Sequence, residues 1–218
     1  MTFTPPAFIA FTGVDRLELR DGMEQLANRY PIEWGILIDE SPRGSTLFPA
    51  PDIVRDLLEG STLRWAAHIC GALATRIASG EEKTPQALLR QFGRLQINHG
   101  FSGSTPAQAR HCSGYASLVG ARAVLQCQGE FPRDNQVDWL FDVSFGRGSR
   151  PAAWPSLPGG GAFCGYSGGI NADNVRDILA AIAAAPGSTY WIDMESGVRT
   201  DGLLDLGKCE AVCRAVFD

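Results

Sequence analysis

The sequence predicts an α/β fold, a (β/α)8 TIM barrel of eight parallel strands that forms a single domain over residues 1–218. Short apolar runs recur along the chain, and segments with helical periodicity separate most of them, as in such a barrel. The runs are continuously apolar rather than alternating, which is typical of strands covered on both faces. A doubly wound open sheet is the alternative, but no G-x-G-x-x-G turn follows the first run, which disfavours a dinucleotide-binding fold.

Eight segments are apolar enough to form buried strands. The first (AFIAFT) and second (WGILID) each end on a polar residue. The sixth (VDWLFDV) has a carboxylate one residue before its end. The seventh, FCGY, is unusually short. The predicted strands are residues 7–12, 34–39, 63–70, 94–98, 121–128, 137–143, 163–166 and 190–194.

Helical periodicity lies between these runs. The segment 171–185 is the clearest, because Asn171 is a good N-cap and Val175, Ile178 and Ile182 follow at helical spacing. The last segment, 206–217, carries its apolar residues on one stripe. No helix is predicted between the fifth and sixth strands. The predicted helices are residues 17–30, 52–59, 71–78, 85–92, 105–118, 171–185 and 206–217.

Composition narrows the functional classes. The net charge of -5 argues against binding nucleic acid, which requires a basic face. The N-terminus lacks a basic signal-peptide region, and no apolar run approaches the ~20 residues of a membrane span, so we expect a cytoplasmic protein without membrane contact. The six cysteines form no C-x-x-C pair and are expected to be reduced thiols. We expect no metal and no cofactor.

Polar residues follow almost every predicted strand. In a (β/α)8 barrel the carboxyl ends of the strands form the ligand-binding face, so these side chains are expected to share one rim. Capping of turns and helices is the alternative role for each of them. They are Thr12, Asp39, His68, Asn98 with His99, Gln126 or Gln128, Asp142, Ser167 and Asp193.

Glycine-rich turns follow the last two strands. The seventh runs into Ser167, Gly168 and Gly169, and the eighth into Glu195, Ser196 and Gly197. Turns after strands seven and eight form the usual phosphate site of this barrel, because glycine lets backbone N–H groups approach an anion and a helix N-terminus adds partial positive charge. The pattern predicts a phosphate-binding site there.

Several motifs together resemble phosphoribosylanthranilate isomerase. The stretches SGGINADNV (167–175) and IDMESGVRTDGLLDLGKCEAV (192–212) are similar to that family's GGLNPENV and DVSSGVE. Ser41-Pro42-Arg43 matches its SPR after the second strand. Leu95-Gln96-Ile97 resembles its VQLHG, and Phe141-Asp142 with the segment 146–154 resembles its LLD…GGTGKTFDW. The matches keep their order along the whole chain.

The resemblance implies an isomerase with a role like that in tryptophan biosynthesis. Family members convert an aminosugar phosphate into a ketone by an Amadori rearrangement, in which a general acid opens the ribose ring and a general base removes the C2 proton. By resemblance, Asp142 is the acid and Arg43 pairs with the anthranilate carboxylate. Gly168, Gly169, Ser196 and Gly197 bind the phosphate, and Asp193 points toward the pocket or braces it.

Three positions depart from the family pattern, and at one of them Ala10 stands where the family has Lys. Thr12 stands where the family has its catalytic Cys, and a threonine hydroxyl ionises far above neutral pH. His68 and His99 are alternative bases, because histidine titrates near neutral pH. Glu195 stands where the family has Ser and adds negative charge to the phosphate site. Arg147 and Arg150, on a facing loop, are expected to compensate and to contact substrate.

Three functions therefore stay open. The first is a sugar-phosphate isomerase of the phosphoribosylanthranilate type. The second is a paralogue with lyase, aldolase or epimerase chemistry, including a metal-dependent epimerase that uses Asp39, His68 and Asp142. Schiff-base chemistry is disfavoured, because Lys83 and Lys208 lie away from strand ends. The third is a non-catalytic barrel that binds a phosphorylated ligand. The expected partner is a small phosphorylated sugar, and the chain is expected to be a monomer or homodimer.

Overall fold

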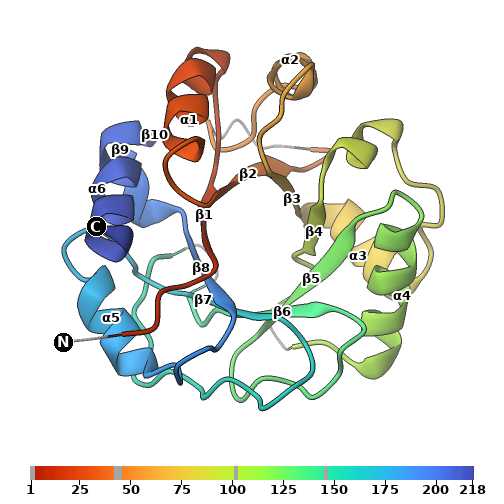
Figure 1. The fold of residues 1–218 in the computed structure, drawn as a ribbon. Coiled ribbons are helices and arrows are strands. Elements are labelled where there is room, and N and C mark those ends of the chain that lie inside the picture. The colour runs from red at the N-terminus through yellow and green to blue at the C-terminus, as the bar shows by residue number, and fades with distance from the viewer. Residues whose placement is uncertain (1–2, 42–45, 101–102, 145–146) are drawn as a thin grey trace.

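The fold is a closed barrel of eight parallel strands (Figure 1), as the sequence predicts. The computed structural model describes residues 3–41, 46–100, 103–144 and 147–218. Each strand pairs with the next along the chain, and β8 pairs with β1 to close the barrel. The strands are β1 (Phe8–Thr12), β2 (Ile32–Ile38), β3 (Trp65–Ile69), β4 (Arg94–Ile97), β5 (Arg122–Cys127), β6 (Asp138–Phe141), β7 (Cys164–Ser167) and β8 (Tyr190–Met194).

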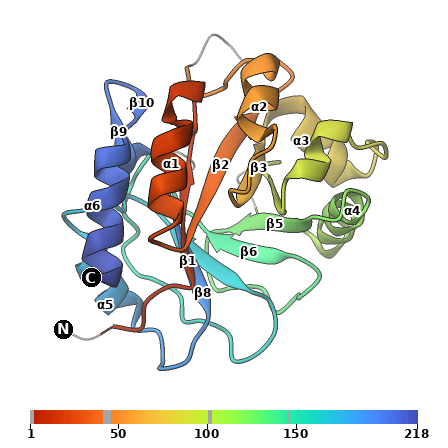
Figure 2. The ribbon, with the colours of Figure 1, turned by 45° about the horizontal axis from the view of Figure 1, so that its top comes forward.

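Helices surround most of the barrel (Figure 2). Among them, α4 begins with a complete capping box, in which Thr105 and Gln108 each bond to the other's backbone N–H. The Asp205 carboxylate caps α6 by accepting from the backbone N–H groups of Gly207 and Lys208. The α-helices are α1 (Arg20–Ala27), α2 (Pro51–Leu58), α3 (Gly71–Ser79), α4 (Pro106–Ser117), α5 (Val175–Ile182) and α6 (Leu206–Phe217). The shorter elements are η1 (Leu17–Leu19), η2 (Ala87–Gln91), η3 (Ser196–Val198), β9 (Arg199–Thr200) and β10 (Leu203–Leu204).

Two predicted helices were wrong in extent or type. The segment 85–92 forms only the 3₁₀ helix η2, in which Leu89 is the buried residue, so it lacks the apolar stripe that would hold a longer helix against the barrel. Asn171 does not start α5, which begins at Val175. The Asn171 side chain instead accepts from the backbone N–H groups of Asp173 and Asn174, which stabilises a turn that precedes the helix.

Loops cover the barrel wall beside β6. No helix lies between β5 and β7 in the part of the chain that the structure describes, and Figure 1 shows loops before and after β6. Aromatic rings replace a helix as the packing layer: Tyr166 contacts Phe131 and Trp154 edge-on, with centroids 5.2 and 5.9 Å apart. The Tyr166 hydroxyl donates a 2.7 Å hydrogen bond to the carbonyl of Pro155. The expected absence of a helix after the fifth strand is confirmed, and the absence extends to the sixth.

Inside the barrel lies a small hydrophobic cluster that is separate from the main core. Phe8, Ala10, Val124, Leu140 and Trp191 form its apolar part. The guanidinium of Arg94 lies 4.0 Å from the centre of the Trp191 ring, and its Nη1 donates to Glu33 at 2.9 Å. This layer fills the barrel interior between β1, β5, β6 and β8 with packed side chains.

None of the described helices is long and apolar enough to cross a membrane.

Candidate functional site

A pocket of about 310 Å³ opens at the carboxyl ends of the strands. This is the face where (β/α)8 barrels place their active sites, because the loops that follow the strands converge there. The lining residues come from strand ends and from the loops after them. They are Thr12, Leu37, His68, Cys70, Gly71, Gln96, Asn98, Gln126, Asp142, Ser144, Gly148, Ser167, Gly168, Gly169, Ile170, Asp193, Met194, Glu195 and Ser196.

Asp142 follows β6 and is held in the pocket by its neighbours. Its Oδ1 accepts hydrogen bonds from the backbone N–H of Ser144 at 2.7 Å and from the Ser144 hydroxyl at 2.8 Å. Its Oδ2 accepts from the amide of Gln126, at the end of β5, at 3.1 Å. Asp142 is 4% exposed and lines the pocket.

Asp193 enters the same pocket from β8. The hydroxyl of Thr12, on the neighbouring strand β1, donates a 2.7 Å hydrogen bond to Asp193 Oδ1. Thr12 Oγ1 also lies 3.3 Å from His68 Nε2. Because the hydroxyl proton points to Asp193, Thr12 can only accept from His68, which assigns the imidazole proton to Nε2. Gly35 makes this contact possible, since a Cβ there would lie 2.8 Å from the Thr12 hydroxyl oxygen and 2.9 Å from the imidazole.

Burial shifts the pKa values of Asp193 and His68, the two groups that contact the Thr12 hydroxyl. It raises the pKa of Asp193 to about 7, the Thr12 hydrogen bond opposes the shift, and the charges of Asp142, Glu195 and Glu33 add to it. Burial, followed by the charge of Arg94, lowers the pKa of His68 to about 3. His68 is therefore a neutral imidazole at neutral pH and too weakly basic to accept a proton there.

The loops after β6, β7 and β8 touch one another through glycines. A Cβ on Gly169 would lie 2.7 Å from the carbonyl oxygen of Gly148, and one on Gly197 would overlap the carbonyl oxygen of Ile170. Gly168 and Gly169 have φ angles of +129° and +63°, which L side chains rarely adopt. The glycines therefore bring three loops into contact, and Ser167, Gly168, Gly169 and Ser196 line one side of the pocket.

Negative charge dominates the pocket. Its described lining carries three carboxylates, Asp142, Asp193 and Glu195, and no Lys or Arg. Arg147 and Arg150 are exposed on the loop after β6 and do not line it. Burial raises the pKa of Glu195, and the charge of Arg199 opposes this. In the described lining, the donors open to an anion are backbone N–H groups and neutral side chains, among them the serine hydroxyls and the Asn98 amide.

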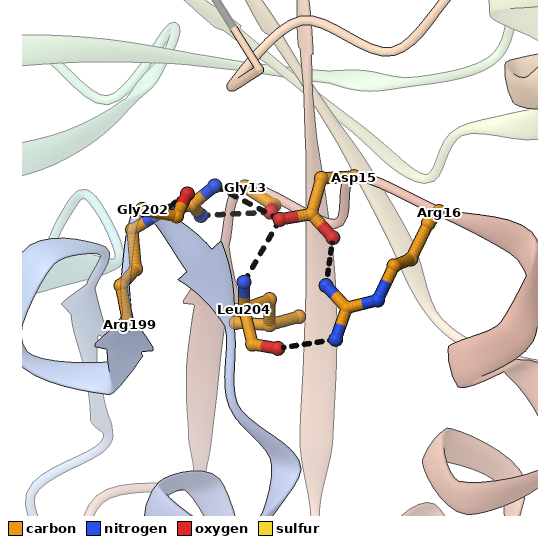
Figure 3. Close-up of polar contacts among 6 residues, drawn as sticks. All are labelled: Gly13, Asp15, Arg16, Arg199, Gly202 and Leu204. Atoms are coloured by element: carbon orange, nitrogen blue, oxygen red, sulfur yellow. Dashed lines mark hydrogen bonds and ion pairs between the residues drawn. The ribbon is translucent and has the colours of Figure 1, made fainter.

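A buried ion pair joins the loop after β1 to the segment after β8 (Figure 3). The Arg199 guanidinium donates to the carbonyl of Gly13 at 2.9 Å, to Asp15 Oδ2 at 3.0 Å and to the carbonyl of Gly202 at 3.0 Å. The backbone N–H of Leu204 donates to the same Asp15 oxygen at 2.8 Å. Arg16 bonds to the other Asp15 oxygen. These contacts fix the ends of β1 and β8, which carry Thr12 and Asp193.

The structure brings most of the predicted site residues together. Nine of them line the pocket: Thr12, His68, Asp142, Ser167, Gly168, Gly169, Asp193, Glu195 and Ser196. Gly197 lies behind this surface, against Ile170. His99 lies outside the described lining and its Nε2 is 2.8 Å from the hydroxyl of Ser104. Arg43 is outside the described residues.

Two contributors were not predicted from the sequence. Ser144 holds Asp142 through two hydrogen bonds, and its position two residues after the carboxylate was the available signal. Cys70 lines the pocket, where the Asn98 amide lies 3.4 Å from its sulfur, and burial raises the pKa of its thiol.

The metal-dependent alternative is not supported by the geometry. The described residues contain no group of three or more His, Cys, Asp or Glu side chains placed to hold a metal ion. Two of its proposed ligands, Asp39 and His68, bond to different partners. Asp39 Oδ1 accepts from the backbone N–H of Ser41, and His68 bonds to Thr12.

Comparison with known proteins confirms the resemblance inferred from the motifs. No family model matches the chain. N-(5'-phosphoribosyl)anthranilate isomerase of Lipomyces starkeyi is 38% identical over 78 residues, which are 36% of this chain and 30% of that relative. The chain thus matches less than a third of the length of that relative.

Solved structures share the fold over nearly the whole chain. Phosphoribosylanthranilate isomerase of Pyrococcus furiosus has a TM-score of 0.61 at 15% identity and covers 96% of this chain and 98% of its own. That of Thermotoga maritima has a TM-score of 0.62 at 16% identity with the same coverage. A tryptophan synthase α-subunit of Pyrococcus furiosus has a TM-score of 0.53 at 12% identity and covers 99% of this chain and 98% of its own. At these identities the likeness of the structures establishes the (β/α)8 fold.

Proposed function

We propose that the protein is a sugar-phosphate isomerase that performs an Amadori-type aldose–ketose rearrangement, on phosphoribosylanthranilate or a closely related aminosugar phosphate. One observation carries this proposal. Two buried carboxyl groups, Asp142 and Asp193, share a pocket at the carboxyl ends of the strands, beside the glycine turns that follow β7 and β8. An acid and a base close to an anion cradle are the groups that this reaction requires. The sequence similarity to a curated phosphoribosylanthranilate isomerase supports the same reaction.

Asp142 is the general acid in this proposal. Protonation of the ribose ring oxygen lets the bond between that oxygen and C1 break, which leaves an iminium between C1 and the anthranilate nitrogen. Gln126 and Ser144 orient the carboxyl group toward the pocket through three hydrogen bonds. A proton donor in a fixed position is worth a factor of roughly 10² to 10⁴ in rate.

The phosphate end of the substrate binds at the glycine turns. Backbone N–H groups of Gly168 and Gly169 and the hydroxyls of Ser167 and Ser196 supply the donors, because the described lining offers no Lys or Arg side chain. The positive charges of Arg147 and Arg150, on the loop after β6, attract the phosphate without contacting it. Arg43 pairs with the anthranilate carboxylate. No cofactor takes part, and the protein acts as a monomer or homodimer in the cytoplasm without nucleic acid or membrane partners.

Turnover of phosphoribosylanthranilate tests the proposal directly. Wild-type protein and the Asp142→Asn variant are mixed with substrate, and NMR follows the loss of the aldose C1 signal and the appearance of a ketone signal. Wild-type turnover that falls at least about 100-fold in the variant supports the isomerase function. Absence of turnover by wild-type protein, together with no thermal stabilisation by the substrate, contradicts it.

Glu195 favours a second candidate, a diverged barrel whose ligand is not a phosphate dianion. Its carboxylate lines the pocket beside Ser196, and it would repel an anion there. Thermal-shift titration with ribose 5-phosphate and with ribose separates the two candidates. Stabilisation by the phosphate alone supports the isomerase, whereas equal stabilisation by both sugars, or a preference for ribose, supports the diverged barrel.

A further inference from the structure

The position of the family's catalytic cysteine cannot supply a base in this chain. Thr12 stands there, and its hydroxyl proton is committed to Asp193 at 2.7 Å. A threonine hydroxyl does not ionise near neutral pH. Any isomerisation at this site therefore requires another group on the same side of the pocket to remove the C2 proton.

His68, His99 and Cys70 are unsuited to this role. His68 is 4% exposed and donates its Nε2 proton to Thr12, and burial lowers its pKa to about 3, so it does not accept a proton near neutral pH. His99 lies outside the described lining, against Ser104. Cys70 lines the pocket, but burial raises the pKa of its thiol and keeps it protonated. Asp193 is the remaining group that touches Thr12 and lines the pocket.

We infer that Asp193 is the general base of this site, and that Thr12 is a positioning residue that holds its carboxylate where the family places a cysteine. This inference rests on the proposed isomerase function. The two strands β1 and β8 are hydrogen-bonded neighbours. Asp193 is hydrogen-bonded to Thr12, so a base at Asp193 acts from the same side of the pocket as a base at position 12 would.

The free oxygen of Asp193 is suited to this role. Oδ1 is occupied by Thr12, whereas Oδ2 accepts no hydrogen bond from the described residues. The side-chain atoms that are fully buried without a hydrogen-bond partner do not include Asp193 Oδ2. This oxygen therefore keeps some exposed surface, in a residue that lines the pocket. This oxygen is open to the ligand, and the rest of the carboxyl group is buried. It can therefore accept a proton from carbon without first losing a hydrogen bond.

The chemical step is balanced without a further reactant. Asp193 Oδ2 takes the C2 proton of the iminium formed by ring opening, the electron pair of the C2–H bond forms a C1=C2 double bond, and the C=N electron pair moves to the nitrogen. The resulting enaminol becomes the ketone when C1 gains a proton and the 2-hydroxyl loses one. Substrate and product are isomers, so no oxidant or reductant is needed.

The surroundings of Asp193 place its titration in a useful range. Burial raises its pKa to about 7, with the charges of Asp142 on β6, Glu195 on β8 and Glu33 on β2 adding to the shift. Thr12 on β1 lowers the pKa by donating to it, and His68 on β3 stays neutral. The base is then ionised above about pH 7, and kcat/KM is expected to rise with pH through that value.

The experiment compares four proteins on phosphoribosylanthranilate across pH 5.5 to 9: wild type, Asp193→Asn, Thr12→Val, and the double variant Thr12→Cys/Asp193→Asn. We expect Asp193→Asn to lose at least about 100-fold in kcat. Thr12→Val removes the donor and is expected to move the rising limb of the kcat/KM profile to higher pH, which a merely structural role would not do. The double variant, with a thiol where the family has one, is expected to recover part of the lost rate.

The outcomes separate this inference from the function on which it rests. Activity that survives in Asp193→Asn overturns the inference and leaves the isomerase function standing. The single variant Thr12→Cys provides a further control: if it is active while wild-type protein is inactive, the site is a decayed isomerase site and Asp193 is not a base. If all of these proteins are inactive, both proposals are overturned. Folding of each variant is checked by thermal unfolding.

Discussion

The hydroxyl of Thr12 donates a 2.7 Å hydrogen bond to the carboxylate of Asp193, a residue 181 positions further along the chain. The contact exists because β8 pairs with β1 to close the barrel. It joins a buried carboxyl group, a hydroxyl and the neutral imidazole of His68 by hydrogen bonds in the lining of the pocket. Its consequences for stability can be measured independently of catalysis.

Asp193→Asn is expected to stabilise the protein at pH 8. The folded-state pKa of Asp193 is raised to about 7 from a usual value of 3.8, so the folded state binds the extra proton between these values and loses stability as the pH rises through them. The asparagine amide stays neutral and still accepts from Thr12. Urea unfolding should show a gain on the order of 2 to 4 kcal/mol at pH 8 that shrinks toward zero at pH 4.

The control for this measurement is Asp173→Asn, which changes an exposed carboxylate before α5. Its effect should be small and should not grow between pH 4 and pH 8. A constant difference between Asp193→Asn and wild type over this range would show that the Asp193 carboxyl group is not desolvated in the folded protein.

Arg94→Met is expected to destabilise the barrel strongly. Arg94 stacks on Trp191 and pairs with Glu33 at 2.9 Å, and the two side chains are only 12% and 3% exposed. Removal of the cation leaves Glu33, whose pKa burial already raises, without its partner. The expected loss is about 3 to 5 kcal/mol in urea unfolding, and Glu33→Gln in the same chain should recover much of it.

Arg214→Met serves as the matched control for Arg94→Met. Arg214 pairs with Glu210 one turn away on the exposed face of α6, so its loss should change stability little. Additive losses in the double variant of Arg94 and Glu33 would show that the two charges do not depend on each other.

Gly169→Ala is expected to separate the loops after β6 and β7. The residue has a φ of +63°, and its new methyl group would lie 2.7 Å from the carbonyl oxygen of Gly148. We expect a loss of about 1 to 3 kcal/mol of stability, and loss of thermal stabilisation by inorganic phosphate. Gly159→Ala, on a part of the loop with open space around its Cβ, should leave both quantities near wild type. Undiminished phosphate binding by Gly169→Ala would place the anion elsewhere.

Arg199→Lys is expected to loosen the ends of β1 and β8. The guanidinium makes three hydrogen bonds, to Gly13, Asp15 and Gly202, with one planar fork (Figure 3), and an ammonium cannot reproduce that geometry. The Arg199 side chain is 8% exposed, so we expect a loss of about 2 to 4 kcal/mol in urea unfolding. Arg16→Lys is the matched control, because Arg16 binds the same carboxylate from a side chain that is 34% exposed. Equal losses in the two variants would contradict the dominant role of Arg199.

Part of the candidate site was predictable because strand ends are visible in the sequence. A continuous apolar run that stops on Asp142 or Asp193 marks both a buried strand and the residue at its mouth. The glycine turns at 168–169 and 196–197 were likewise recognisable, since few other residues permit close contact between loops. His99 shows the limit of this reasoning, because this polar residue two positions past β4 lies against Ser104, outside the described pocket lining.

The missing helices beside β6 were only partly predictable. The sequence between the fifth and sixth strands lacks helical periodicity, but the packing that replaces a helix depends on Phe131, Trp154 and Tyr166 meeting from three separate segments. Hydrophobic contacts between segments distant in sequence leave no periodic pattern.

The sequence by itself determined the strand count, the parallel α/β class and the ring of polar groups at the strand ends, because each of these follows from continuous apolar runs, the polar residues that follow them and the helical periodicity between them. Only the tertiary structure decided that Thr12 holds Asp193, that His68 is neutral and that three carboxylates share a pocket whose described lining has no Lys or Arg. The physical reason is that hydrogen bonding and desolvation depend on which residues become neighbours, and closure of the barrel joins the first strand to the last.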